Sequence, residues 1–515
     1  MTVAALRNPP APKVAPWLLG FLAVYLLAQT LLRLLAVSSL GVDDAEMVVI
    51  SQNLAWGYGS QPPLYNWLQA VFFAVFGFGT MAIAILHFLL LFGAFAFTFF
   101  AGRIVFASDV KAAGVALALF ALPQVGWEAL HSHTHTLLAL VCSAATLLAM
   151  LRVLERGRWG DYAILGVCIA LGAMSKYNYL LFAGALLVAG ASLPALRPRV
   201  LSWRMLAALV LALCLLGPHL HWVLTHTDET LSRTFKFGLD QESALLAVWA
   251  RGVLGFVISV ASYLALAVAV FAAAALFPVL DRADRPADRR TRLPEARAFI
   301  VRVLVVALAV VLVVVLASRA TELKERWLQP VLFIGPFVLM ALAEPYLTAF
   351  RQRLVVVFSA GIGVAFLVAL AVAYLFPAVN GTPMRSLAPF ESLAGDVRDL
   401  GFTRGTILAS DFYVGGNLRL HIPEAAVAEP EYGLASLPGA ADGPMLLAWP
   451  GNRDRPPRPL RALLETLCGE DVAFVPAETK HFTRRYENAR RARYALSVAV
   501  IADCPAPASK PALNQ

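Results

Sequence analysis

Charged side chains are scarce in this sequence. Asp, Glu, Lys and Arg make up 15% of the 515 residues, whereas 59% of the residues are hydrophobic. A soluble globular protein carries roughly 25% charged and 45–50% apolar residues. The deficit is concentrated in uncharged blocks of about 20 residues, which are long enough to cross a hydrocarbon core of roughly 30 Å. The composition therefore excludes an ordinary soluble protein and predicts an α-helical polytopic membrane protein.

Three further features are missing. No basic stripe with interleaved aromatic residues accounts for the net charge of +9, so we expect no nucleic acid partner. No glycine-rich phosphate loop follows a predicted strand, so the sequence gives no sign of a nucleotide site. The first apolar block, residues 17–37, has no small-residue cleavage site after it and is expected to remain as a membrane span. These absences favour a substrate that reaches the protein through the membrane.

The apolar blocks and the charged loops predict a topology. Eleven candidate spans lie near residues 17–37, 80–102, 111–130, 135–151, 161–175, 178–196, 205–223, 247–277, 298–317, 327–343 and 354–376. Arg and Lys gather in alternate loops, and the loop from Asp281 to Arg297 is the richest in Arg. By the positive-inside rule these loops are cytoplasmic. We therefore expect a multi-pass protein of the bacterial inner membrane, with the N-terminus in the cytoplasm and the C-terminal segment in the periplasm.

The composition changes near residue 377. Residues 1–376 are expected to form the transmembrane domain, with a periplasmic loop at 38–79, and residues 377–515 a soluble periplasmic α/β domain. Short apolar runs predict strands and one amphipathic run predicts a helix. The strands are Thr406–Leu408, Met445–Trp449, Val472–Val475 and Ala495–Ile501, and the helix is Pro459–Leu467. Cys468 and Cys504 lie in this segment, and the sequence leaves open whether they form a disulfide.

Three carboxylates follow the first span, in the sequence Asp43-Asp44-Ala-Glu46. Carboxylates at such a place can act as a general base or bind a divalent metal that bridges a phosphate. They can also be solvated residues at the end of a span. The spacing does not separate these roles.

The same loop contains Gln61-Pro62-Pro63-Leu64-Tyr65 and predicts an amphipathic helix over Pro63–Phe76, opened by proline in its first turn. Its Trp and Tyr side chains are typical of a membrane interface. We therefore expect this helix to lie along the outer surface, beside the carboxylates, rather than to span the membrane.

Other polar groups fall on the same predicted side. A short loop carries His131, His133 and His135, which either bind a metal together with Glu128 or merely end a span. Lys176 stands between two apolar blocks, where it either snorkels to the surface or pairs with an anionic phosphate. A later outer loop holds Lys324 and Arg326, which add two more cations.

These motifs, in this order, resemble the integral-membrane glycosyltransferases of the protein O-mannosyltransferase and lipid A aminoarabinose transferase type, glycosyltransferase family 39 with the GT-C fold. Members typically show an Asp-Glu pair after the first span, a Pro-Pro-Leu motif before an amphipathic helix, a Ser-Lys-Tyr-like run and a late Arg-Tyr/Trp-x-x-Pro element. The corresponding residues here are Asp43-Asp44, Gln61–Leu68, Ser175-Lys176-Tyr177 and Lys324–Pro330. The resemblance covers about residues 15–345.

This sequence departs from the family pattern in three places. The acidic pair is Asp-Asp, with Glu46 two positions later; Gln61 stands where Lys or His often precedes Pro-Pro; and the stretch His133–His135 replaces a second acid. These departures bear on the identity of the base, on the phosphate contacts and on any metal.

The resemblance implies sugar transfer from a polyprenyl-phosphate donor to a cell-envelope acceptor such as lipid A, core oligosaccharide, another glycan or a protein. Asp43 or Asp44 is then the base, with Glu46 as a further acidic candidate, and a divalent metal is possible. The substrate contacts implied are Gln61, Pro63, Tyr65, His133, His135, Lys176, Tyr177, Lys324 and Arg326. The alternative is a transporter or lipid flippase, although transporters place polar groups near the bilayer midplane and these spans are polar at their outer ends.

Overall fold

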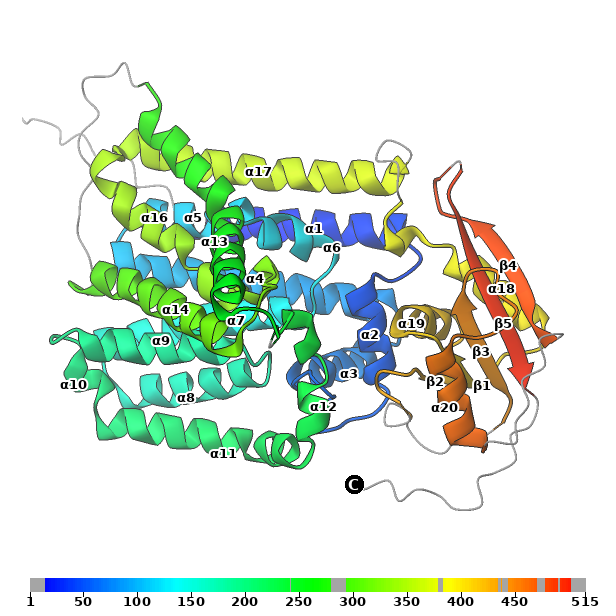
Figure 1. Cartoon of the computed structure of the whole chain (residues 1–515). Coiled ribbons are helices and arrows are strands. Elements are labelled where there is room, and N and C mark those ends of the chain that lie inside the picture. The colour runs from blue at the N-terminus through cyan, green and yellow to red at the C-terminus, as the bar shows by residue number, and fades with distance from the viewer. Residues whose placement is uncertain are drawn as a thin grey trace, which may run out of the picture.

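The computed structural model describes residues 14–240, 242–278, 293–377, 383–433, 437, 443–469, 478–489 and 491–501. A bundle of long helices makes up most of the molecule, and a small α/β domain is attached to one end of the bundle (Figure 1). The division follows the composition, since apolar helices end at Leu375 and all five strands come later in the chain.

Eight stretches of helix in the described part of the chain are long and apolar enough to cross a membrane. They are α1 (Val14–Ala36), α4 (Thr80–Phe106), α7 (His135–Glu155), α11 (Trp203–Thr225), α13 (Leu245–Leu276), α14 (Ala296–Ser318), the run Gln329–Tyr346 and α17 (Ala349–Leu375). The run Gln329–Tyr346 is made of α15 (Gln329–Leu332), α16 (Gly335–Ala343) and η5 (Glu344–Tyr346).

The other three predicted spans are helical but are not simple spans. Residues 109–131 form α5 (Asp109–Leu117), η1 (Ala118–Ala121), η2 (Gln124–Glu128) and α6 (Ala129–His131), with a bend of 77° after Ala121. The predicted spans 161–175 and 178–196 are α8 (Trp159–Ala173) and α9 (Tyr179–Ser192), of 15 and 14 residues. At about 1.5 Å per residue each is only about 22 Å long, short of a hydrocarbon core of roughly 30 Å. The expected eleven spans thus become eight, or nine if the bent pair counts as one.

The bend in residues 109–131 has a local cause. Pro123 lacks a backbone N–H and pushes Leu122 into an extended conformation, which ends the helix there. Gly126 then lies so close to Phe120 that a Cβ would overlap the Phe120 carbonyl oxygen. The chain can therefore fold back sharply only because residue 126 has no side chain.

Burial sorts the long helices into inner and outer ones. Most of α7 and α4 is buried inside the bundle, whereas in α11, α13 and α17 only about a fifth of the apolar stretch is buried. Leu213, Leu254 and Val357 are examples of the exposed side chains on these helices. A soluble protein rarely exposes apolar surface on this scale, so these faces contact lipid.

The loop after the first span contains two helices, α2 (Val42–Ile50) and α3 (Leu64–Phe76). The predicted helix over Pro63–Phe76 is confirmed as α3, which begins directly after Pro63. Asn66 and Gln69 are fully buried against the bundle, whereas Val71 and Val75 are exposed. The polar side of α3 thus faces the protein and its apolar side faces outward, as suits a helix in contact with lipid.

The remaining short helices connect these elements. They are α10 (Arg197–Val200), α12 (Thr227–Leu231), η3 (Thr234–Phe237), η4 (Glu325–Trp327) and η7 (Arg385–Leu387).

A five-stranded sheet forms the centre of the C-terminal domain. The strands β1 (Gly405–Ala409), β2 (Ala425–Ala428), β3 (Met445–Pro450), β4 (Lys480–Arg485) and β5 (Arg493–Ile501) follow the order β2-β1-β3-β5-β4. β2, β1 and β3 are parallel, and β5 runs antiparallel to both β3 and β4. The predicted strands at 406–408, 445–449 and 495–501 are confirmed, and the one at 472–475 lies outside the described residues.

Helices cover both faces of this sheet. Alternate residues of β3 take opposite sides, as a strand requires. Leu446 and Ala448 join the core shared with α18 (Phe390–Asp399) and α19 (Phe412–His421). Leu447 and Trp449 pack instead with α20 (Arg458–Cys468), which confirms the helix predicted at Pro459–Leu467. Cys468 at the end of α20 is disulfide-bonded, and Cys504 lies outside the described residues.

The C-terminal domain is docked tightly on α2. Gly416 in α19 lies against Ala45, where a Cβ would overlap the Ala45 backbone. The Asn417 side chain accepts a hydrogen bond of 2.7 Å from the Leu40 N–H. The Arg419 guanidinium donates one of 2.6 Å to the Val48 carbonyl. Helix α2 is therefore held between the bundle and the C-terminal domain (Figure 1).

Candidate active site

The second carboxylate of the acidic triplet is part of a buried ion pair. Asp44 lies in the first turn of α2, and its carboxylate accepts a hydrogen bond from the Arg33 guanidinium of α1. Both side chains are almost fully buried. A pair of this kind is costly to break because the remaining charge would be left without a partner. Asp44 thus anchors α2 to the bundle.

The first carboxylate is more open. Asp43 is half-buried, and its Oδ2 accepts a hydrogen bond of 3.2 Å from the His133 backbone N–H. Burial raises the pKa of Asp43 above its ordinary value, and the nearby charges of Arg326 and Lys176 act in the opposite direction. A carboxylate with a raised pKa beside cations is suited to accept a proton during a reaction.

Lys176 lies in the loop between α8 and α9, at residues 174–178. Its Nζ donates a hydrogen bond of 2.6 Å to the Thr136 hydroxyl. Burial, with a contribution from Arg326, lowers the pKa of Lys176 to about 7, and Asp43 opposes this change. Lys176 is half-buried, and its Nζ is hydrogen-bonded to Thr136 near an acid and another cation rather than extended into water.

Hydrogen bonds to the main chain hold this loop against its neighbours. The Leu64 N–H donates to the Met174 carbonyl at 3.1 Å, which fixes the loop to the start of α3. The Asn178 side chain donates to the Trp327 carbonyl at 2.5 Å, which fixes it to η4. The structure thus brings three loops that are far apart in the sequence to one place.

Arg326 lies in η4 and Lys324 directly precedes η4, and the two cations differ in position. Arg326 is half-buried and close enough to Asp43 and Lys176 to influence the charge of both. Lys324 is exposed, and its Nζ lies over the Trp327 ring at 5.9 Å from the centroid. Of the two predicted contacts, Arg326 joins the cluster and Lys324 lies at its rim.

The histidine stretch follows the bend at Pro123 and reaches the same place. His133 adopts a left-handed backbone conformation, with φ of 71°, which aims its N–H at Asp43. His135 packs against Tyr65 of α3, with ring centroids 5.4 Å apart. Among the residues that the structure describes, no group of three or more His, Cys, Asp or Glu is placed to hold a metal ion. The interpretation of this stretch as a metal site is therefore not supported.

The remaining predicted contacts surround the cluster. Pro63 directly precedes α3, and the backbone of Gln61 is hydrogen-bonded to that of Tyr58. Both residues therefore belong to the segment that leads into α3. Tyr177 stacks on His219 of α11, with ring centroids 5.8 Å apart and nearly parallel planes. The side chain of Tyr65 is fully buried, so this tyrosine does not sit at the membrane interface as expected.

The sequence analysis named Glu46 as an acidic candidate but missed its partners, Arg233 and Tyr432. Glu46 forms a buried ion pair of 2.7 Å with Arg233, from the loop after α12. Tyr432 of the C-terminal domain donates a hydrogen bond of 2.5 Å to Glu46, and Arg233 also pairs with Glu431. The Glu46 carboxylate thus joins the helical bundle to the C-terminal domain. Arg33 was missed as well, although a charged residue inside the first apolar block is itself a sign of a buried partner.

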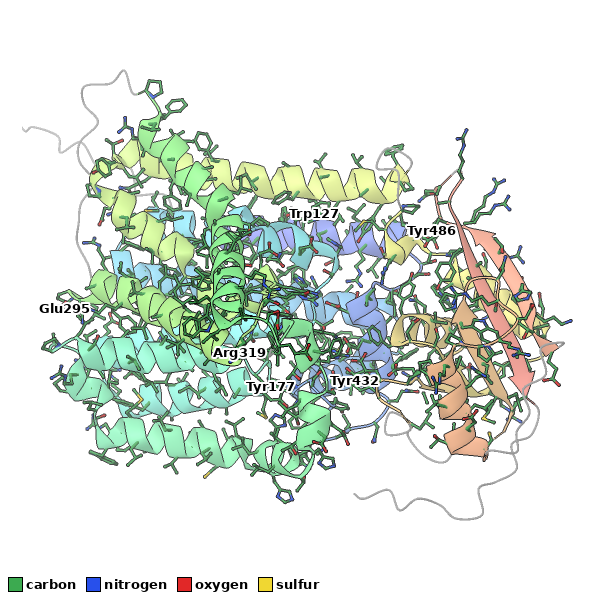
Figure 2. All side chains as sticks on the ribbon, in the orientation of Figure 1. Trp127, Tyr177, Glu295, Arg319, Tyr432 and Tyr486 are labelled. Atoms are coloured by element: carbon green, nitrogen blue, oxygen red, sulfur yellow. The ribbon has the colours of Figure 1, made fainter. Side chains whose placement is uncertain are left out.

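These groups lie at the end of the bundle that faces the C-terminal domain. Figure 2 shows Tyr432 on the side of the C-terminal domain and Glu295 at the opposite end, with Tyr177 between them. The arrangement combines a half-buried carboxylate, Asp43, with two cations, Lys176 and Arg326. Chemically, it can bind a phosphate through the cations and accept a proton through the carboxylate.

Comparison with known proteins identifies the family of the chain. Residues 60–222 match the model of the family described as dolichyl-phosphate-mannose-protein mannosyltransferase. The chain is 33% identical over 446 residues to the lipopolysaccharide core galacturonosyltransferase RgtA of Rhizobium johnstonii, covering 84% of this chain and 86% of that one. It is also 33% identical over 443 residues to RgtB of the same organism, covering 84% and 87%.

Solved structures share the fold. The chain superimposes on ArnT from Cupriavidus metallidurans bound to undecaprenyl phosphate with a TM-score of 0.58 and 15% identity, covering 96% of this chain and 99% of that one. The apo structure of the same ArnT gives a TM-score of 0.59 and 16% identity at the same coverage. The identity to these two relatives over most of both chains shows the family: this protein belongs to their family of bacterial membrane glycosyltransferases with the GT-C fold and acts on glycans of the cell envelope.

Proposed function

We propose that this protein transfers a uronic acid sugar, of the galacturonic acid type, from a polyprenyl-phosphate donor to the lipopolysaccharide core. The observation that carries the proposal is that Asp43, Lys176 and Arg326 lie close enough to influence one another's charge, at the end of the bundle where α2 and α3 lie (Figure 1). The names of the two relatives support the sugar and the acceptor. The undecaprenyl phosphate bound to ArnT, which shares the fold, supports the donor.

The proposed orientation places the site in the periplasm. Residues 1–376 then form the catalytic membrane domain in the inner membrane, and residues 377–515 a periplasmic domain that closes the site. Arg156, Arg197 and Arg199, which lie in or beside α10 at the far end of the bundle (Figure 1), support this orientation, because basic segments of this kind stay in the cytoplasm. A polyprenyl-phosphate donor suits the location, since it is delivered from within the bilayer and needs no nucleotide.

The reaction is a displacement at the anomeric carbon of the donor sugar. A hydroxyl of the acceptor attacks this carbon, the bond from the carbon to the phosphate oxygen breaks, and the polyprenyl phosphate leaves with the electron pair. Asp43 accepts the proton of the attacking hydroxyl. Lys176 and Arg326 stabilise the negative charge that develops on the phosphate. A single displacement inverts the anomeric centre.

The three acids have separate roles in this scheme. Asp44 and Glu46 are tied up in ion pairs with Arg33 and Arg233, so each neutralises a buried arginine and positions α2. Asp43 forms no ion pair in the described part of the chain. Within the same residues it interacts with Lys176 and Arg326 electrostatically, without direct contact, and accepts a hydrogen bond only from the His133 backbone. The base is therefore Asp43 rather than Asp44.

A comparison of Asp43→Asn and Asp44→Asn tests the proposal. Each purified variant is incubated with polyprenyl-phosphate-linked radiolabelled galacturonic acid and lipopolysaccharide core, and transfer is measured per folded molecule after gel filtration. Loss of a general base lowers the rate by about 10²–10⁴-fold, which we expect for Asp43→Asn alone. If Asp43→Asn keeps the wild-type rate, the base assignment is wrong. If the wild type transfers other lipid-linked sugars but no galacturonic acid, the sugar assignment is wrong.

A further inference from the structure

A pocket lies at the end of the bundle opposite to the candidate active site. It has a volume of about 380 Å³ and is formed where α8, α10 and α11 meet. Arg156, Arg199 and Arg204 line it together with Tyr162 and Trp203. The helix α10 is at the far end of the bundle from α2 and α3 (Figure 1). The proposed reaction makes no use of this pocket.

Two of its arginines are fixed in place by the main chain. Arg199 donates to the Leu154 carbonyl, and the Arg204 Nη1 donates to the Gly157 carbonyl at 2.9 Å. Both side chains are half-buried. A guanidinium group has five N–H donors, so each arginine keeps several donors for a ligand.

The charge of these two arginines is not neutralised by nearby acids. Within the described residues, Arg199 and Arg204 form no ion pair with a carboxylate. Glu155 pairs with Arg156 at 3.4 Å, and the Asp161 carboxylate accepts a hydrogen bond from the Arg158 N–H at the start of α8. Two fixed guanidinium groups without carboxylate partners, next to a polar cavity, form a site for an anion, and phosphate matches their geometry best.

The surroundings of the pocket indicate an anion with apolar chains. Trp159 and Trp203 pack edge to face, with ring centroids 4.3 Å apart, and both are exposed. Leu201 and Leu206, on either side of Trp203, are also exposed, with 69% and 62% of their surfaces accessible. Exposed Trp beside exposed Leu is typical of the depth at which lipid headgroups meet acyl chains. A free phosphate ion would leave this apolar rim uncovered.

We infer that this pocket binds the phosphate group of an anionic phospholipid, with the guanidinium groups of Arg199 and Arg204 on the phosphate and Trp203 against the acyl chains. In the proposed orientation the site belongs to the cytoplasmic leaflet, where anionic lipids and basic pockets attract each other. The leaflet from which the lipid binds depends on the proposed orientation. The binding of an anionic phospholipid in this pocket does not depend on the proposed reaction.

The test uses the full-length protein in a neutral detergent. Native mass spectrometry counts bound lipids after addition of phosphatidylglycerol or of phosphatidylcholine, and thermal unfolding is followed with each lipid and with inorganic phosphate. We expect phosphatidylglycerol to bind and to raise the unfolding temperature, and the other two additions to have little effect. Equal effects of the two lipids, or an effect of inorganic phosphate as large as that of phosphatidylglycerol, would overturn the inference.

Matched variants locate the binding. The double variant Arg199→Gln/Arg204→Gln should bind phosphatidylglycerol about tenfold more weakly, since it loses charge-assisted hydrogen bonds to the phosphate. The control is Arg197→Gln, because Arg197 is exposed on the same helix α10 and hydrogen-bonds only the Ala191 carbonyl. If the double variant does not fold, Arg156→Gln replaces it, because Arg156 lines the same pocket and is exposed. This variant should also weaken the binding of phosphatidylglycerol. Equal loss in the pocket variant and in Arg197→Gln would refute the assignment of the site.

Discussion

The charge state of Lys176 leads to a specific prediction about pH. Burial and the neighbouring Arg326 lower the pKa of Lys176 from 10.5 to about 7 in the folded protein without substrate. The proposed role of Lys176 needs the ammonium form, because only a cation stabilises the leaving phosphate. With a pKa of about 7, roughly nine-tenths of the molecules carry this cation near pH 6 and roughly one-tenth near pH 8. We therefore expect kcat/KM for the donor to fall about tenfold between these pH values.

Stability changes in the opposite direction over the same range. Between about pH 7 and 10.5 the unfolded chain keeps the proton on Lys176 and the folded protein does not, so this lysine makes folding more favourable as the pH rises. The gain is at most on the order of 5 kcal/mol, at 1.36 kcal/mol for each pH unit. A loss of activity above pH 7 therefore cannot come from unfolding at this residue.

The assay is donor turnover by purified protein across the pH range, with wild type and two variants. Lys176→Arg keeps its charge at all accessible pH values and should retain measurable activity without the fall above pH 7. Lys176→Met should lose most activity at every pH. Lys480→Met, which removes an exposed lysine on β4, serves as a control that should follow the wild-type profile. A wild type without a fall near pH 7, or an identical fall in Lys176→Arg, would refute the role of Lys176.

Three further predictions concern the framework of the site. Asp44→Asn leaves Arg33 buried without its counter-charge and should lower the free energy of unfolding by about 3–5 kcal/mol, measured by denaturant unfolding in detergent. Gly126→Ala forces a methyl group into the sharp bend and should cost about 1–3 kcal/mol in the same assay. Tyr432→Phe removes the hydrogen bond to the Glu46 carboxylate and should cost about 1.5–3 kcal/mol, with faster protease cleavage between α17 and the C-terminal domain.

Each of these predictions has a control or a contrary outcome. Gly20→Ala is matched to the glycine variant, because no atom lies within 4 Å of a Cβ there, and it should leave stability equal or slightly higher. Replacement of both Arg33 and Asp44 by leucine should recover much of the stability lost in the single variant, and failure to do so would argue against a simple ion pair. Unchanged protease sensitivity of Tyr432→Phe would show that this tyrosine does not hold the two parts together.

Several features of the fold could be predicted from local patterns. The proline and apolar spacing of Pro63–Phe76 predict α3 because both signals arise within a few residues. The strands at β1, β3 and β5 follow from short apolar runs between turn residues. The positions of Asp43, Lys176 and Arg326 near one another could be proposed because the predicted topology put all three loops on one side.

Other features depend on the tertiary structure and leave little trace in the sequence. The lengths of α8 and α9 depend on where residues 174–178 leave the helix, and composition around Lys176 is equally apolar on both sides. The hydrogen bond between Glu46 and Tyr432 joins residues 386 positions apart. The surroundings of Asp43 and Asp44 differ because Arg33 of α1 lies beside Asp44, which adjacent positions in a sequence cannot reveal.

The docking of α19 on α2 has a mechanical consequence. Gly416 and Ala45 meet backbone to backbone, and Asn417 clamps Leu40, so the sheet and the helix that bears Asp43 cannot slide past each other without losing this fit. A large acceptor that binds the sheet would transmit force directly to α2, because α19 and α2 are in backbone contact. Force applied to the C-terminal domain would thus be transmitted to α2 and to Asp43, and removal of that domain would leave one side of α2 uncovered.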